Sequence, residues 1–220
     1  MNTHIKSLTS NKIRTAMKKT VLVLGSAVVI IFAACTKSND NNQFLQAHDA
    51  NRMMDSMHAV MDRMNAMTMT NDPEVDFANM MMMHHEGAIN MANAELQYGA
   101  NDSLKRFAQK VITDQQAEIM EFESILATLS MDNMDMEFMQ EQMDNMGKMS
   151  KAADVQLITG DIDNDFATLM IWHHQSAIDN ASAYLHHGNN EQLKMIATNI
   201  IKAQTMEIQE LADWLKANKR

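Results

Sequence analysis

Residues 77–89 have the sequence FANMMMMHHEGAI, and residues 166–178 have the sequence FATLMIWHHQSAI. Both stretches carry a Phe, a Met, a His-His pair and an Ala-Ile pair at the same spacing. A shift of 89 residues aligns 76–126 with 165–215 without a gap, and 22 of the 51 aligned positions are identical. Self-similarity at a fixed shift is the signature of a repeated structural unit. The fold is therefore expected to contain one unit twice.

Each copy has the pattern of a helical hairpin. In the first copy, apolar residues recur every three or four positions from Phe77 to Leu96 and again from Leu104 to Leu126, which is the period of an amphipathic helix. Two antiparallel helices cannot bury their apolar faces alone, so two hairpins are expected to close into an antiparallel four-helix bundle. A chain with one proline and six glycines fits this all-α prediction.

The ends of these helices also have sequence signals. Asp72 before Pro73 predicts an N-cap followed by proline in the first turn. Gly99 is expected to end that helix in a left-handed conformation. Either Asn101 or Asp102 is expected to cap the helix that follows.

The N-terminal segment has the composition of an export signal. Lys18 and Lys19 precede an apolar stretch, residues 21–34, that is too short to span a bilayer comfortably. The stretch ends at Cys35, the only cysteine, and resembles a bacterial lipoprotein signal in which that cysteine is lipidated. Thr36, where an aspartate often retains such proteins in the inner membrane, favours the outer membrane. An uncleaved anchor is the alternative, and in both cases the rest of the chain is expected outside the cytoplasm.

Charge and composition divide the chain further. Residues 1–35 contain five Lys/Arg and no acidic residue, which leaves 13 Lys/Arg against 28 Asp/Glu in the remainder. Such an acidic surface repels nucleic acid. The expected organisation is a signal peptide (1–35), a polar tether with a Met-rich helix (36–72) and a bundle (73–220). Within the bundle, hairpins at 73–129 and 163–218 are joined by a Met-rich connector at 130–162.

The two His-His pairs are candidate ligands within the bundle. Successive helical residues diverge by about 100°, so one histidine of each pair is expected to face the bundle and the other its edge. Antiparallel pairing about the hairpin turns places the pairs level with polar residues of the partner helices, so that all converge on one layer: His84, His85, His173 and His174 with Gln115, Glu118, Gln204 and Glu207. The alternative is a structural polar layer that fixes helix register.

Methionine is the most unusual feature, with 25 in 220 residues. Met80, Met81 and Met170 precede the histidines by three or four positions, which places thioether and imidazole on one helix face. Such soft ligands suit Cu(I). The connector repeats the methionines at short intervals, at Met131, Met134, Met136, Met139, Met143, Met146 and Met149. These are candidate ligands of a second, less defined Cu(I) store outside the repeat. The alternative is a Met-rich surface that packs on the bundle or a partner.

The motif Phe-x-x-x-Met-x-x-His-His-x-x-Ala-Ile, present at 77–89 and 166–178, resembles the bacterial exported family catalogued as domain of unknown function 305. The resemblance covers about residues 73–218. It implies a ferritin-like four-helix bundle, with some members being Met/His-rich copper-binding proteins. By motif, its conserved positions fall on the four histidines and on nearby Met81 and Met170.

The residues favour a non-enzymatic, exported, lipid-anchored protein that sequesters or chaperones Cu(I), with Ag(I) as a second cargo and another transition metal as a candidate at the bundle site. Expected partners are the metal ion, a membrane through Cys35, and a metal-delivery protein or a second copy of the chain. One alternative is a structural or partner-binding lipoprotein with a Met-rich interface. A ferritin-like metalloenzyme is less favoured, because Glu118 and Glu207 are followed three residues on by glutamate rather than by histidine.

Overall fold

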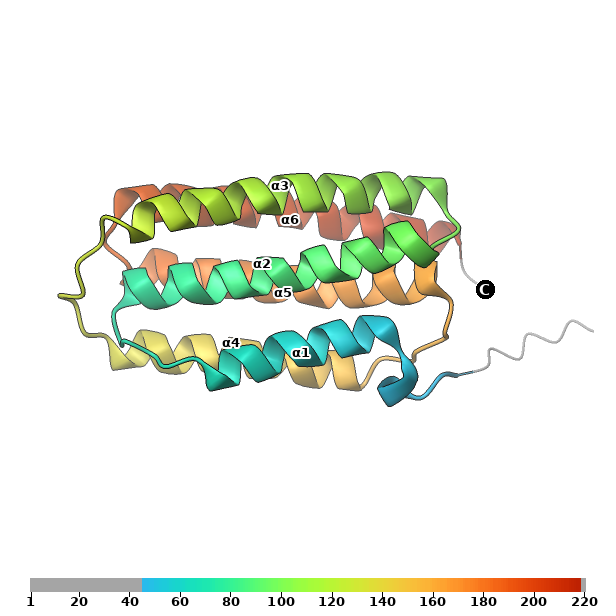
Figure 1. The fold of residues 1–220 in the computed structure, drawn as a ribbon, viewed down its shortest axis with the longest axis horizontal. Helices are drawn as coiled ribbons and strands as arrows, with labels where there is room; N and C mark the ends of the chain where they lie inside the picture. The colour runs from blue at the N-terminus through green and yellow to red at the C-terminus, as the bar shows by residue number, and fades with distance from the viewer. Residues whose placement is uncertain (1–44, 219–220) are drawn as a thin grey trace, which may run out of the picture. The chain divides into compact units, whose positions relative to one another are not determined.

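The computed structural model describes residues 45–218, and the regular secondary structure in this range is entirely helical. A short 3-10 helix (His48–Ala50) precedes six α-helices: α1 (Arg52–Ala66), α2 (Pro73–Tyr98), α3 (Asp102–Leu126), α4 (Met136–Asp154), α5 (Ile162–His187) and α6 (Glu191–Ala217) (Figure 1). The all-α prediction is therefore confirmed. The predicted signal segment and Cys35 lie outside the described residues. Within the described range, no helix combines the length and apolar character needed to cross a membrane.

Helices α2 and α5 form the middle of three layers. In Figure 1 they lie between α3 and α6 on one side and α1 and α4 on the other. The packing agrees with this view, because α2 contacts α1, α3 and α5, while α5 contacts α4 and α6. Helices α1 and α4 thus form a third layer, which packs on α2 and α5 of the two hairpins, α2–α3 and α5–α6. As a result, α2 buries side chains on opposite faces, including Phe77, His84 and His85.

The duplicated unit extends through the turns that precede α2 and α5. In the first turn, Asp76 accepts hydrogen bonds from the backbone N–H and the hydroxyl of Thr70. In the second turn, Asp165 accepts the same two bonds from Thr159, 89 residues later. The residue after each threonine has a left-handed backbone, with φ 66° at Asn71 and 75° at Gly160. The two turns therefore have the same construction.

Helices α1 and α4 also occupy equivalent places, although the sequence analysis left them outside the repeat. Only 5 of the 24 positions from 52–75 are identical in 141–164, which is too few to notice without the structure. The pattern of buried positions is nevertheless repeated, although most of the residue types differ. Four buried positions of α1 recur 89 residues later in α4: Met53 as Gln142, Met57 as Met146, Val60 as Met149 and Met64 as Ala153. The repeat is thus a three-helix unit.

Helix starts follow the predicted capping chemistry. Asp72 accepts hydrogen bonds from the backbone of Glu74 and Val75, and Pro73 occupies the first turn of α2. Of the two candidates for the cap of α3, Asn101 is the N-cap. These side chains satisfy backbone N–H groups that have no partner inside the helix.

The end of α2 differs from the prediction. Gly99 has φ −64° and ψ 157°, and its repeat counterpart Gly188 has φ −72° and ψ 156°, so neither is left-handed. Glycine is required there for space instead. A Cβ on Gly99 would collide with the side chain of Glu95, and a Cβ on Gly188 would collide with the ring of Tyr184.

Close packing of α1 on α2 gives a matched pair of expected results. Gly87→Ala should lower the free energy of unfolding by about 1–3 kcal/mol, because the new Cβ would overlap Val60 of α1. Gly147→Ala in α4 should raise it by about 0.5–1 kcal/mol, since nothing lies within 4 Å of that position. Urea unfolding of both variants measures the two changes. A Gly87→Ala variant as stable as Gly147→Ala would contradict this packing.

Candidate metal site

His84 and His173 meet at the centre of the middle layer. Their ring centroids are 3.7 Å apart, the rings are tilted by 42°, and both side chains are fully buried. Among residues 45–218, neither ring nitrogen of either histidine has a hydrogen-bond partner. Burial holds the pKa of each ring well below its usual value. The next cause is the charge of His173 for the ring of His84, and the charge of His174 for the ring of His173. Both imidazoles are therefore neutral at physiological pH, with a free nitrogen lone pair, as a metal ligand must be.

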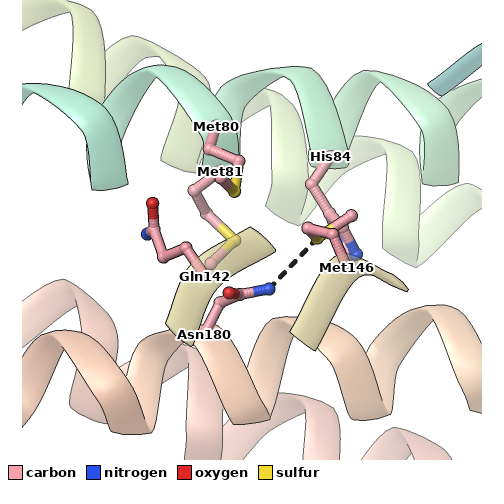
Figure 2. A pocket seen from close by; sticks show the side chains of 6 residues that line it. All are labelled: Met80, Met81, His84, Gln142, Met146 and Asn180. Atoms are coloured by element: carbon pink, nitrogen blue, oxygen red, sulfur yellow. Dashed lines mark hydrogen bonds between the residues drawn. The ribbon is translucent and has the colours of Figure 1, made fainter. Parts of the chain in front are cut away.

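A pocket on the α4 side of His84 is lined by this histidine and by three thioethers. Figure 2 shows the side chains of α2, α4 and α5 that converge on it: Met80, Met81, His84, Gln142, Met146 and Asn180. The space between them is too small to admit a water molecule. Three sulfurs and one imidazole thus share a dry, enclosed volume.

Helical spacing explains how the pocket is assembled. On α2, Met80 and His84 are four residues apart, and on α4, Gln142 and Met146 are also four apart. Side chains at this spacing lie on the same face of a helix. The packing of α4 on α5, and of α2 on α5, then directs both faces toward Asn180.

Polar groups in the pocket are incompletely satisfied. Asn180 donates to the sulfur of Met146 at 3.1 Å, a contact drawn in Figure 2, and the hydroxyl of Ser176 donates to the same sulfur at 3.4 Å. Both side-chain polar atoms of Gln142 and the Oδ1 of Asn180 have no partner. Buried polar groups without partners are costly, so their presence together suits a site that takes a ligand.

The second histidine of each pair faces the opposite layer. The Nε2 of His85 lies 2.7 Å from Glu118 on α3, and the Nε2 of His174 lies 3.1 Å from Glu207 on α6. These are ion-pair distances without hydrogen-bond alignment, since the nitrogens of both rings lack a partner of good geometry. Lys110 adds a third member to the second pair, with its Nζ 2.6 Å from Glu207.

The Lys110 contact makes the two His–Glu pairs unequal. Burial by itself would raise the pKa of Glu207, but the nearby His174 and Lys110 outweigh it and lower that pKa. The repeat counterpart of Lys110 is Asn199, which carries no charge. Sequence reasoning missed Lys110, because its partner lies 97 residues away on another helix.

The single polar layer predicted from the sequence is thus divided in two. His84 and His173 face the α1–α4 side, whereas His85 and His174 face the carboxylates of α3 and α6. No histidine of the four lies at an edge, since all are at most 1% exposed. The reason is that α1 and α4 cover the side that a four-helix bundle would leave open. Gln115 and Gln204 are also buried, and each has an unpartnered Oε1.

The predicted Met-rich connector is divided as well. Its first residues are exposed, at 72% for Met131, 77% for Met134 and 57% for Met136. Met139 and Met143 are partly buried, and Met146 and Met149 are buried on the inner face of α4. Met146 therefore belongs to the histidine pocket rather than to a separate store. Met170 is also fully buried.

Sequence reasoning did not single out Gln142 or Asn180, since an isolated amide in a helix carries no ligand pattern. For Asn180 the only signal was the repeat, in which its counterpart is Met91, and the correspondence of Gln142 with Met53 becomes visible only with the structure. Within residues 45–218, no three His, Cys, Asp or Glu side chains converge as a metal-binding group. The soft ligands of the pocket, thioethers, are of a different kind.

Solved structures similar to this chain include three metal-bound forms of one protein. "CopM in the Cu(I)-bound form" is 26% identical, with a TM-score of 0.50, and the match covers 67% of this chain and 98% of that one. "CopM in the Ag-bound form (by soaking)" is 26% identical, with a TM-score of 0.52 and coverage of 67% and 97%. "CopM in the Cu(II)-bound form" is 27% identical, with a TM-score of 0.51 and coverage of 66% and 96%.

Among curated proteins, nothing matches the chain. The family described as "Domain of unknown function (DUF305)" matches it twice, over residues 6–126 and 127–215. The boundary between the two matches falls directly after α3, so each match contains one of the three-helix units. Together the matches span nearly the whole chain, and the protein belongs to the DUF305 family.

Proposed function

We propose that this protein is an exported, lipid-anchored metal-binding protein that sequesters or passes on Cu(I), and also Ag(I), without catalysing a reaction. The observation that carries the proposal is the pocket that Met80, Met81 and Met146 line together with the unpartnered His84. Thioether and neutral imidazole are soft ligands that favour Cu(I) over harder ions. A thioether also needs no deprotonation before it coordinates.

The enclosure of the pocket supports the same cargo. No water fits among its side chains, so an ion held there would have to exchange its hydration shell for protein ligands. Hydrated, hard cations such as Mg²⁺ resist this exchange. The copper-bound and silver-bound forms of CopM, to which this chain is similar, are consistent with such a cargo.

Export is proposed from the sequence. The basic residues, the apolar stretch at 21–34 and Cys35 support a lipid anchor on the periplasmic side or at the outer membrane. Metabolic labelling with a palmitate analogue tests this part alone: the label should appear in the protein and disappear in Cys35→Ser. An unlabelled protein would refute the anchor and leave the metal site unaffected.

Removing two thioethers of the pocket should cost one bound ion. Met80→Leu with Met146→Leu keeps the apolar volume, so the protein should fold, but it should hold one fewer equivalent of Cu(I) against a competing chelator. The matched control, Met120→Leu with Met206→Leu, changes two exposed methionines (62% and 60% exposed) and should bind like the unaltered protein. The measurement uses purified full-length protein in detergent under anaerobic conditions. Affinity of the unaltered protein no tighter than micromolar, or an unchanged stoichiometry in the pocket variant, would overturn the proposal.

A second candidate function is partner binding through methionine. Met131 and Met134, between α3 and α4, and Met136, the first residue of α4, are exposed, and flexible Met surfaces suit adaptable interfaces. This candidate is favoured if Cu(I) does not bind and Leu replacements at these three positions abolish capture of a specific partner protein.

A further inference from the structure

The residues that line the pocket around His84 have repeat counterparts on the His173 side of the molecule. The shift of 89 residues that relates the two three-helix units carries each lining residue to a defined position in the other unit. Met81 becomes Met170, His84 becomes His173, Gln142 becomes Met53, Met146 becomes Met57, Asn180 becomes Met91 and Met80 becomes Leu169. The counterpart set therefore has four thioethers and one imidazole.

Burial in the structure agrees with this placement. Met53, Met57, Met91, Leu169 and Met170 belong to one apolar cluster, and each is at most 1% exposed. They come from α1, α2 and α5, which are all in contact with one another. These are the counterparts of α4, α5 and α2, the three helices that line the first pocket.

The ring of His173 faces this cluster. The Cβ position of Gly87 on α2 lies 3.1 Å from the Nε2 of His173 and against the side chain of Val60 on α1. The ring is therefore directed toward the layer that holds Met53 and Met57. It is fully buried, and neither of its nitrogens has a hydrogen-bond partner. A buried, unpartnered imidazole beside thioethers is the same arrangement as in the first pocket.

The two pockets differ in polarity. In the first, Ser176 and Asn180 donate hydrogen bonds to the sulfur of Met146. Their repeat counterparts are Gly87 and Met91, which have no side-chain donor. The sulfur of Met57 is thus not engaged by either position, and both amides of the first pocket, Gln142 and Asn180, are replaced by thioethers. The second pocket is therefore the softer of the two.

We propose that Met53, Met57, Met91, Met170 and His173 form a second soft-metal site, which takes a Cu(I)-like or Ag(I)-like ion. The assignment rests on the proposed function for the identity of the ion, but its residues are distinct from those of the first pocket. Each three-helix unit then supplies one histidine of the His84–His173 pair, and the chain holds one ion on each side of that pair.

The test follows the methionine methyl groups by NMR. Full-length protein labelled with ¹³C at the methionine methyl groups is titrated with Ag(I), a redox-stable probe, and each resonance is assigned from single Met→Leu variants. The methyls of Met53, Met57, Met91 and Met170 should shift together with one equivalent of silver. Those of Met80, Met81 and Met146 should shift with another equivalent.

Paired variants separate the two sites. Met53→Leu with Met91→Leu should abolish the shift at Met57 and Met170 and lose one equivalent, while the first pocket still responds. Met80→Leu with Met146→Leu should give the reverse. A response in the first pocket without one in the second overturns this inference and leaves the proposed function standing. No response in either pocket overturns both. Because the unaltered protein gives the primary result, a variant that fails to fold does not leave the question open.

Discussion

Replacing Asp165 with alanine is expected to lower the free energy of unfolding by about 3–5 kcal/mol. The carboxylate is fully buried and accepts four hydrogen bonds, each of 2.8 Å. The donors are the backbone N–H and hydroxyl of Thr159, the backbone N–H of Gly160 and the side-chain amide of Asn51. Alanine would leave these donors without an acceptor in the protein, which costs more than the bonds themselves contribute. Chemical denaturation monitored by circular dichroism measures the loss.

Asp76 provides the matched comparison within the same chain. It accepts the equivalent three bonds from Thr70 and Asn71, whereas Gln140, the repeat counterpart of Asn51, donates its amide to Asp144 instead. Asp76→Ala should therefore cost about 1 kcal/mol less than Asp165→Ala. Asp213→Ala, at an exposed position, serves as the surface control and should change stability little. If Asp165→Ala cost no more than this surface control, the proposed role of the turn would be wrong.

The Asn51 bond also ties the start of α1 to the second unit. Asn51 is the N-cap of α1, and its amide donates to Asp165 at the start of α5. Met53 and Met57 follow directly on α1. Loss of Asp165 should therefore disturb the second pocket more than the first, which the methyl resonances of Met57 and Met146 report separately.

Glu95→Gln is expected to stabilise the protein at pH 8 and to change its stability little at pH 5. Burial, followed by the hydrogen bond and negative charge of Asp163, raises the pKa of Glu95 to about 8 from an ordinary value of 4.5. Two carboxylates can share a hydrogen bond only if one of them holds a proton. If Glu95 and Asp163 are both ionised, the oxygens of Glu95 have no hydrogen-bond donor. The structure therefore favours the protonated acid.

The direction of the pH effect follows from proton linkage. Above about pH 4.5 the unfolded chain releases the Glu95 proton, whereas the folded protein keeps it up to about pH 8. The free energy of unfolding should therefore fall as the pH rises through this window, by about 3 kcal/mol between pH 5 and pH 8. Glutamine cannot ionise, so the variant should lack this contribution to the pH dependence.

Thermal unfolding of both proteins between pH 5 and pH 8 measures the difference. The control is Glu121→Gln, which removes the same charge from an exposed position on α3 and should keep the pH dependence of the unaltered protein. Parallel curves for Glu95→Gln and the unaltered protein would show that Glu95 is ionised in the folded state. The test is independent of metal, because Glu95 is near the end of α2 and does not line the pocket.

Much of the fold was predictable because the relevant patterns are local. The apolar period between Phe77 and Leu96, the Asp72 cap and Pro73 act within one or two helical turns, so they predict where α2 begins and which residues it buries. The ending at Gly99 was predicted for the wrong reason. The collision of a Cβ with Glu95 depends on a side-chain position that the sequence pattern does not encode.

The candidate site was predictable in its members but not in its grouping. The His-His pairs were visible because both halves of the chain contain them. Helices α1 and α4, in contrast, share buried positions but few identical residues. A helical stripe shows that a face is covered without showing by what. The sequence therefore placed Glu118 level with the first His-His pair, but did not reveal that it faces His85 rather than His84, or that Met146 shares a pocket with His84.

The sequence by itself therefore determined the duplication, the helical class and a supply of thioether and imidazole ligands, because repetition and helical period are properties of neighbouring residues. Only the tertiary structure decided which ligands meet. His84 and Met146 are 62 residues apart and share a pocket solely because α4 packs against α2 and α5. The packing of α3 on α2 and of α6 on α5 placed His85 and His174 against carboxylates instead, and so separated two kinds of chemistry that are adjacent in the chain.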